Sequence, residues 1–314
     1  MNQEIFAFDP LPKKTRRETF LQEMNEVVPW AALVGLIQPH ARGAHQALGG
    51  RPPFAIETML RIHCIQLWWN LSDPAMEEEL YERPLYREFA GLLGAKRLPD
   101  ETTILRFRHL LEKHELAPKV LATINEQLAE RGFKLKTGTL VDATLIAAPS
   151  STKNSTGERD PEMHQTRKGK QWFFGMKLHF GVDSKTGLAH SAVVTSANVH
   201  DKHPLPDLLH GAETHLYGDT AYASQQALIR SKAPAAADCT NQRVRAGSAT
   251  EGLDRILNRL KSRVRSRVEH VFAVVKRLWG FDKVRYRGLA KNATRAFVAT
   301  GLANIYLARE RLAA

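Results

Sequence analysis

The spacing of apolar positions changes near residue 132, and this change divides the chain into two regions. Before it, apolar residues recur at intervals of three and four, as at Ile56, Met59 and Leu60, which is typical of amphipathic helices. We therefore predict an all-helical N-terminal region, preceded by a basic-ended arm at residues 1–17. Its helices are expected at residues 19–28, 54–69, 75–82 and 100–111.

Beyond Gly132 the apolar residues form short runs of strand length. Three such runs come first, and helices then alternate with further strands, which indicates an α/β domain with a mixed five-stranded sheet. The residues from Asp183 to Gly187 are expected to join two strands as a hairpin turn. The strands are predicted at residues 139–146, 172–182, 188–195, 215–217 and 236–241, and the helices at residues 205–209, 224–232, 250–279 and 290–312. We therefore expect two domains, at residues 1–132 and 133–314.

The predicted helix at residues 250–279 has an apolar stripe, which we expect to pack on the sheet. Arg265, Glu269 and Lys276 share a different face, so the helix would present a cation, an acid and a cation. A simpler interpretation is an ion pair between Arg265 and Glu269, worth about 0.2–0.5 kcal/mol. The stripe consists of Leu253, Leu257, Leu260, Val264, Val268, Val271, Val275 and Leu278.

The positive charge is concentrated toward the C-terminus. The chain of 314 residues has a formal net charge of +12. Residues 251–295 alone contain 13 Lys and Arg against 4 Asp and Glu, a net charge of +9. This concentration favours a polyanionic partner, because Lys and Arg contacts to phosphates release counterions. A basic protein without such a partner is the simpler alternative.

Other features argue against several classes of protein. The two cysteines, Cys64 and Cys239, are far apart in the sequence, so a disulfide framework or a zinc finger is not expected. No apolar stretch approaches the roughly 20 residues that a membrane span needs. The N-terminus also lacks the apolar core of a signal peptide. We expect a cytoplasmic protein without a membrane partner.

Three acidic residues stand in settings that suggest catalysis. Asp142 lies within an apolar strand, Asp219 ends a second strand, and Glu269 lies on the long basic helix. Two strand carboxylates and one helix carboxylate can converge on divalent metal ions, for which Mg²⁺ with its preference for oxygen ligands is the natural choice. In a chain this basic, the expected substrate is a nucleic-acid phosphodiester. Taken singly, an exposed edge-strand Asp142 and a helix-capping Asp219 are equally good interpretations.

Further basic residues are candidates for DNA contacts. The helices at residues 54–69 and 75–82 have the outline of a helix-turn-helix, but the second is acidic, so we favour plain packing for it. Arg106 and Arg108, on the helix at residues 100–111, are better placed. The polar loop at residues 150–170 carries Lys168 and Lys170, and a DNA-facing loop and a merely solvated one are equally good interpretations.

Several ordered blocks make the chain similar to a known family. They are residues 141–150, Ala197 to Asp201, Tyr217 to Tyr222, residues 267–272 with 276–280, and residues 284–292. These blocks resemble those of DDE transposases of bacterial insertion sequences, specifically the insertion-sequence-five family. The helix signature of that family spaces its residues as Y-x2-R-x3-E-x6-K. Arg265, Glu269 and Lys276 fit this signature, and Ser262 stands where the family has tyrosine.

The resemblance implies an RNase H-like catalytic domain behind a helical N-terminal domain for DNA binding or dimerisation. Asp142 would lie on its first strand, Asp219 just after its fourth and Glu269 on a later helix. These acids would hold two Mg²⁺ ions, which Mn²⁺ can replace, with Asp142 as the shared ligand. Arg265 and Lys276 would hold the DNA backbone.

The activity implied is transposition of the encoding element. The chain would bind the terminal inverted repeats, cut the DNA ends and join the 3′-OH to target DNA, working as a homodimer or higher assembly on double-stranded DNA. Two alternatives stay open from the sequence. One is an RNase H-like nuclease or resolvase that cuts without joining, and the other is a domesticated, non-catalytic DNA-binding protein.

Overall fold

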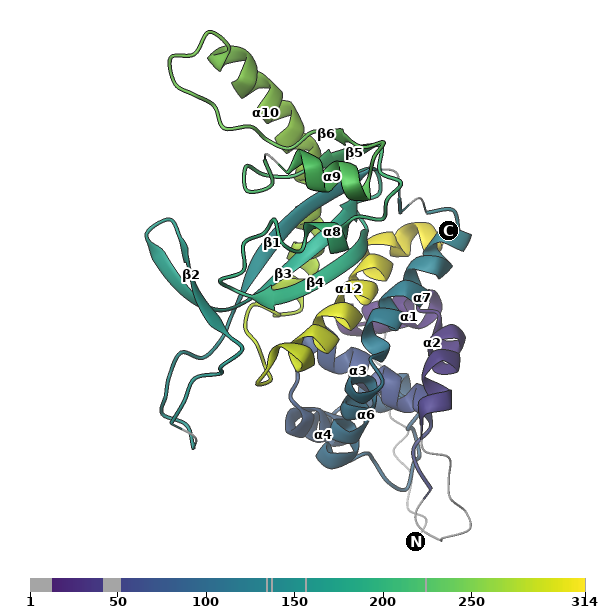
Figure 1. The fold of residues 1–314 in the computed structure, drawn as a ribbon. Helices are drawn as coiled ribbons and strands as arrows, with labels where there is room; N and C mark the ends of the chain where they lie inside the picture. The colour runs from purple at the N-terminus through teal and green to yellow at the C-terminus, as the bar shows by residue number, and fades with distance from the viewer. Residues whose placement is uncertain are drawn as a thin grey trace, which may run out of the picture.

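The computed structural model describes residues 13–41, 52–133, 135–136, 138–155, 157–223 and 225–313. A layer of N-terminal helices lies beside a β-sheet, and the C-terminal helix packs against both (Figure 1). Most of the predicted arm at residues 1–17, and the predicted helix start at residue 224, lie outside the described residues.

Some of the N-terminal helices begin at a residue whose side chain caps their free amides. Thr15 and Glu18 form a reciprocal cap on the first helix, with the Glu18 amide donating to the Thr15 hydroxyl at 3.1 Å. Asp100 accepts the Thr103 amide at 2.7 Å and caps a later helix. The helical prediction for this region is confirmed. The helices are α1 (Arg16–Val27), α2 (Trp30–Ile37), η1 (Gln38–His40), α3 (Ile56–Trp69), α4 (Asp73–Glu82), α5 (Pro84–Phe89), α6 (Glu101–Lys113) and α7 (Leu116–Glu130).

The sheet is mixed, as predicted, and has six strands within the described residues. Its order is β2-β3-β1-β5-β6, with β4 paired to β3; β5 runs parallel to β1 and to β6, and the other pairs are antiparallel. The strands are β1 (Thr139–Ala147), β2 (His164–Lys168), β3 (Gln171–Asp183), β4 (Ala189–Ser196), β5 (His215–Tyr217) and β6 (Ala237–Asp238). Between them lie the short helices α8 (Leu205–Leu208) and α9 (Gln226–Lys232).

Strand β2 is the one that the sequence did not predict. It lies in the segment that was expected to be a polar loop, and it pairs with the first part of β3 to form a two-stranded arm beyond the main sheet (Figure 1). Its residues are mostly exposed and polar, so no apolar alternation marks it. The pairing with β3 therefore decides its structure.

The C-terminal helix α12 (Leu289–Leu312) joins the two regions into one continuous core. It packs against α7 and α1 on one side and against β4 on the other. Asn70, in the left-handed conformation at the end of α3, accepts hydrogen bonds from Arg285 and Arg295 at 2.6 and 2.7 Å and donates to the Gly280 carbonyl at 3.1 Å. These contacts link residues more than 200 positions apart. The division into domains at residue 132 stays a prediction.

The helix predicted at residues 250–279 is wrong as a continuous element. It consists of α10 (Glu251–Arg265), a turn at residues 266–267, α11 (Val268–Phe272) and the π-helical segment η3 (Ala273–Leu278). In the second half of the apolar stripe Val268, Val271 and Val275 are buried as expected, whereas Leu278 at its end is 55% exposed. The first half is not packed on the sheet: Leu253 and Leu260 are 58 and 55% exposed, and α10 stands out from the body (Figure 1).

Candidate active site

Parallel pairing of β1 with β5 brings Asp142 and Asp219 together. In this register Leu140 lies beside Tyr217, and each aspartate comes two residues later along its own segment. The two carboxylates therefore reach the same level of the sheet, at the carboxyl end of β5. The Asp142 carboxylate accepts the Ala143 amide at 2.8 Å, and that of Asp219 accepts the Ala221 amide at 2.9 Å.

Gly218, directly before Asp219, lets this segment pack closely against Val141 and Tyr222, because a residue with a side chain would not fit there. A Cβ at this position would lie 2.9 Å from Cδ2 of Tyr222 and 3.1 Å from Cγ2 of Val141. Tyr222 is itself 1% exposed, and its buried hydroxyl has no hydrogen-bond partner within the described part of the chain. Burial, followed by the charges of Asp201, Asp142 and Asp219, raises the pKa of this hydroxyl. An unpartnered polar atom thus lies beside the acids.

The pKa of the Asp142 carboxyl is raised, and the charged residues near it contribute to this shift. Burial is the main cause that raises the pKa of its carboxyl, and the negative charges of Asp219 and Asp201 act in the same direction. The hydrogen bond from the Ala143 amide and the positive charge of Arg265 oppose the shift. A bound cation would stabilise the ionised carboxylate in this setting, because its charge offsets both the cost of burial and the repulsion between like charges. Arg265, at the end of α10, therefore acts on the site itself.

Glu269 is the third predicted acid, and it lies near the start of α11. This short helix contacts β1, and Phe272 on it stacks on Phe180, the β3 residue paired with Asp142. The Glu269 side chain is exposed. Among the described residues, no three His, Cys, Asp or Glu side chains lie close enough together to hold a metal ion. The structure therefore aligns Asp142 and Asp219, but it does not group all three acids within ligand distance of one another.

Lys276 is placed differently from the prediction. Its ammonium group donates to the Thr144 hydroxyl at 3.2 Å and to the Leu145 carbonyl at 2.7 Å, so it ties η3 to β1. Burial lowers the pKa of Lys276, and the neighbouring Lys168 and Arg277 lower it further, although Asp282 opposes them. Because the helix is interrupted, Arg265, Glu269 and Lys276 do not share one continuous helical face.

The other predicted DNA contacts differ in accessibility. Arg108 is 6% exposed, pairs with Asp73 at 3.0 Å and Glu112 at 2.7 Å, and lies over the Tyr286 ring. Its prediction as a DNA contact is wrong, because these partners occupy its guanidinium inside the protein. Arg106, on the same helix, is exposed. Lys168 and Lys170 are also exposed, at the tip of the β2–β3 arm.

Two residues near the acids were not predicted as site residues. Lys177 on β3 pairs with Asp201 at 2.8 Å and also donates to the Val199 carbonyl at 2.7 Å. This pair holds the segment after β4 close to Asp142. Tyr222 is the second such residue. Its position as a large aromatic residue three residues after Asp219, in a turn of otherwise small residues, is the signal in the sequence that could have identified it.

Comparison with known families gives two matches to transposase domains. Residues 134–305, more than half of the chain, match a family described as a transposase DDE domain. The chain belongs to the DDE transposases. A second match, to a family described as a transposase domain (DUF772), covers residues 9–110 of this transposase. Its helical N-terminal region, followed by a mixed sheet with flanking helices, is consistent with an RNase H-like α/β fold, as predicted.

No solved structure matches the transposase chain significantly. Within the ranges that the structure describes, no helix has the length and apolar character needed to cross a membrane.

Proposed function

We propose that this transposase binds the terminal inverted repeats of an insertion sequence of the insertion-sequence-five family, cuts the DNA ends and joins them to target DNA. The observation that carries the proposal is the β1–β5 register, which aligns Asp142 with Asp219 beside the cationic Arg265. This pair lies in the matched transposase domain, next to the most basic part of the chain. DNA is the substrate that fits such a site.

The chemistry needs no side-chain nucleophile. Water attacks the phosphodiester at the element end and frees a 3′-OH, and this 3′-OH then attacks a phosphodiester of the target DNA. Both steps replace one oxygen on phosphorus by another, so the same groups serve both. Asp142, Asp219 and Glu269 are the proposed catalytic acids. Arg265, beside Asp142, would hold a DNA phosphate against the site.

The proposed cofactor is Mg²⁺, for which Mn²⁺ could substitute. The donor chemistry fits: the carboxylates are hard oxygen ligands, and the unpartnered Tyr222 hydroxyl adds a polar group beside them. Two bound ions would supply the charge that activates the attacking oxygen and stabilises the leaving one. Asp142 and Asp219 are the residues that would hold them, with Glu269 as the ligand from α11.

The β2–β3 arm is a second proposed DNA contact. Lys168 and Lys170 stand at its tip, and Trp172 beside them is 64% exposed. Basic residues next to an exposed aromatic ring suit a nucleic acid, because the cations bind phosphate and the ring can stack on a base. Arg106, exposed on α6, is the proposed contact from the helical layer.

Metal removal tests the proposed chemistry. We expect cleavage of a labelled element end in Mg²⁺ or Mn²⁺, complete loss of cleavage in EDTA, and recovery when excess Mg²⁺ is restored. The physical reason is that neighbouring acids repel a phosphodiester unless cations neutralise them. A gel that resolves the cleaved strand measures the result, and a melting curve in EDTA controls for unfolding. Undiminished cleavage in EDTA would contradict the mechanism.

A further inference from the structure

Helix α10 exposes a row of large apolar side chains. Leu253, Ile256, Leu257 and Leu260 follow the spacing of one helical face, and their exposures range from 43 to 59%. The helix stands out from the body of the molecule (Figure 1). Proteins in water rarely leave such a contiguous apolar surface uncovered unless a partner binds it.

The opposite side of α10 is fixed, so the apolar row has a defined direction. Asn258 donates to the Gln242 carbonyl at 2.7 Å, and Lys261 donates to the Thr240 carbonyl at 3.0 Å. Asn241 donates to the Ser262 hydroxyl at 2.9 Å. These bonds hold the segment at residues 240–242 against one face of α10, and the apolar row therefore points away from it.

A row of arginines runs beside the apolar row. Arg255, Arg259 and Arg263 are spaced four residues apart, and at about 100° per residue they border the apolar face on the side away from residues 240–242. All three are exposed. Arg259 and Arg263 make no side-chain hydrogen bond or ion pair within the described residues, whereas Arg255 pairs with Glu251 at 2.6 Å. The outer surface of α10 is thus both apolar and cationic.

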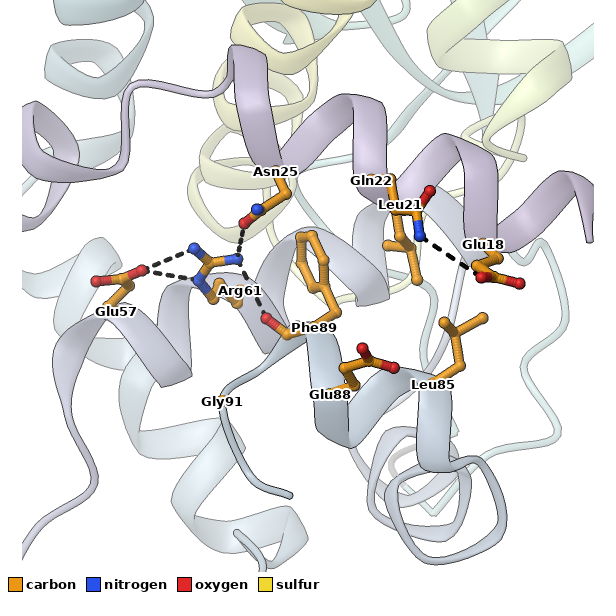
Figure 2. A pocket seen from close by; sticks show the side chains of 10 residues that line it. All are labelled: Glu18, Leu21, Gln22, Asn25, Glu57, Arg61, Leu85, Glu88, Phe89 and Gly91. Atoms are coloured by element: carbon orange, nitrogen blue, oxygen red, sulfur yellow. Dashed lines mark hydrogen bonds and ion pairs between the residues drawn. The ribbon is translucent and has the colours of Figure 1, made fainter. Parts of the chain in front are cut away.

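A groove with the opposite charge lies in the helical layer. It is a cavity of about 310 Å³ between α1, α3 and α5. Leu21, Leu85 and Phe89 supply apolar side chains, and the acids Glu18, Glu57 and Glu88 surround them (Figure 2).

Arg61 is the one cation among the residues that line this groove. It is already bound to Glu57 at 2.8 Å and to the Asn25 side chain at 2.7 Å (Figure 2). It also lies over the Trp30 ring. Glu88 is exposed and has no side-chain partner within the described part of the chain. The groove therefore offers an apolar floor with unneutralised acids.

We infer that α10 of one copy of this chain binds in the groove of a second copy. The apolar row would lie on Leu21, Leu85 and Phe89, and the arginines would face the acids, which is the helix-in-groove mode of recognition. A DNA duplex would meet only the arginine row, would leave the apolar row exposed, and would be repelled by the groove.

The contact can be made twice in one dimer. In Figure 1, α10 lies beyond the sheet at one end of the molecule. Helix α3, which borders the groove, lies in the helical layer at the other end. A two-fold axis would therefore let each copy donate its α10 to the other, which closes the assembly and doubles the buried area.

A charge swap tests this dimer without DNA or metal, so its failure would leave the proposed transposition untouched. One variant carries Arg259→Glu and Arg263→Glu, and the other carries Gln22→Lys and Glu88→Lys in the groove. Light scattering and sedimentation measure the dimer dissociation constant. Each variant alone should weaken the dimer at least about tenfold, because like charges then meet in both contacts. An equimolar mixture should restore it as a heterodimer, because each contact in the mixture pairs opposite charges.

Controls separate assembly from folding. Arg230→Glu, on exposed α9 surface, should leave the dissociation constant unchanged. Leu257→Ser should weaken the dimer without lowering the melting temperature of dilute protein, because this side chain is exposed in the single chain. A wild-type protein that stays monomeric at about 100 µM, or a mixture that fails to restore the dimer, would overturn the inference. So would α10 variants that lose DNA affinity while their oligomeric state is unchanged.

Discussion

Asp142→Asn, Asp219→Asn and Glu269→Gln should each lower DNA cleavage and joining by at least about a thousandfold. Each change removes one negative charge and keeps the size of the side chain, so the loss reflects several kcal/mol of lost metal and transition-state stabilisation. Single-turnover cleavage of a labelled element end, in Mg²⁺, measures the effect.

The matched control for these variants is Asp207→Asn, at an exposed acid on α8. It should leave cleavage unchanged. All four variants should keep the wild-type melting temperature and bind element DNA nearly as tightly, because the acids do not attract phosphate. If any of the three keeps near-normal turnover, that residue does not belong to the active site. The result for Glu269 matters most, because the structure does not group all three acids within ligand distance of one another.

Val268→Asp should lower the free energy of unfolding by about 3–5 kcal/mol, because it places an unpaired charge at a fully buried position. Leu253→Asp makes a similar chemical change in the same predicted stripe, but at a side chain that is 58% exposed. It should change the free energy of unfolding by no more than about 0.5 kcal/mol. Urea denaturation of dilute, monomeric protein measures both.

This pair of variants tests where the predicted helix is interrupted. If Leu253→Asp destabilises the protein as much as Val268→Asp does, α10 packs on the body of the molecule. That result would contradict the position of α10 before the turn at residues 266–267. It would also contradict the inference that α10 binds a second copy.

Where local chemistry determines the structure, the sequence was sufficient to predict it. The hairpin after β3 forms because the Asp183 carboxylate accepts the amides of Lys185 and Thr186 at 2.9 and 2.7 Å, and because Gly187 takes a φ of +72°. The sequence could predict that Asp142 and Asp219 lie near each other, because ligand-binding residues collect at the carboxyl ends of parallel strands. The register itself is visible only in the folded sheet.

Where distant residues decide the structure, prediction from the sequence was wrong. Neither glycine nor proline marks the turn at residues 266–267, and the apolar spacing continues across it. The spacing along α6 gave some indication that Arg108 is buried, since it lies four residues after Ile104 on the apolar face of the helix. Its partner Asp73, 35 positions away, could not be inferred from local spacing.

The most direct test of the account is strand transfer from a pre-cut element end. The transposase is mixed with target DNA, Mg²⁺ and a labelled end that carries either a 3′-OH or a 3′-deoxy terminus, and joined product is resolved on a denaturing gel. We predict joined product from the 3′-OH end, none from the 3′-deoxy end, and none with Asp142→Asn. Cleavage of uncut ends without any joining, or joining that does not need the 3′-OH, would contradict the proposed function.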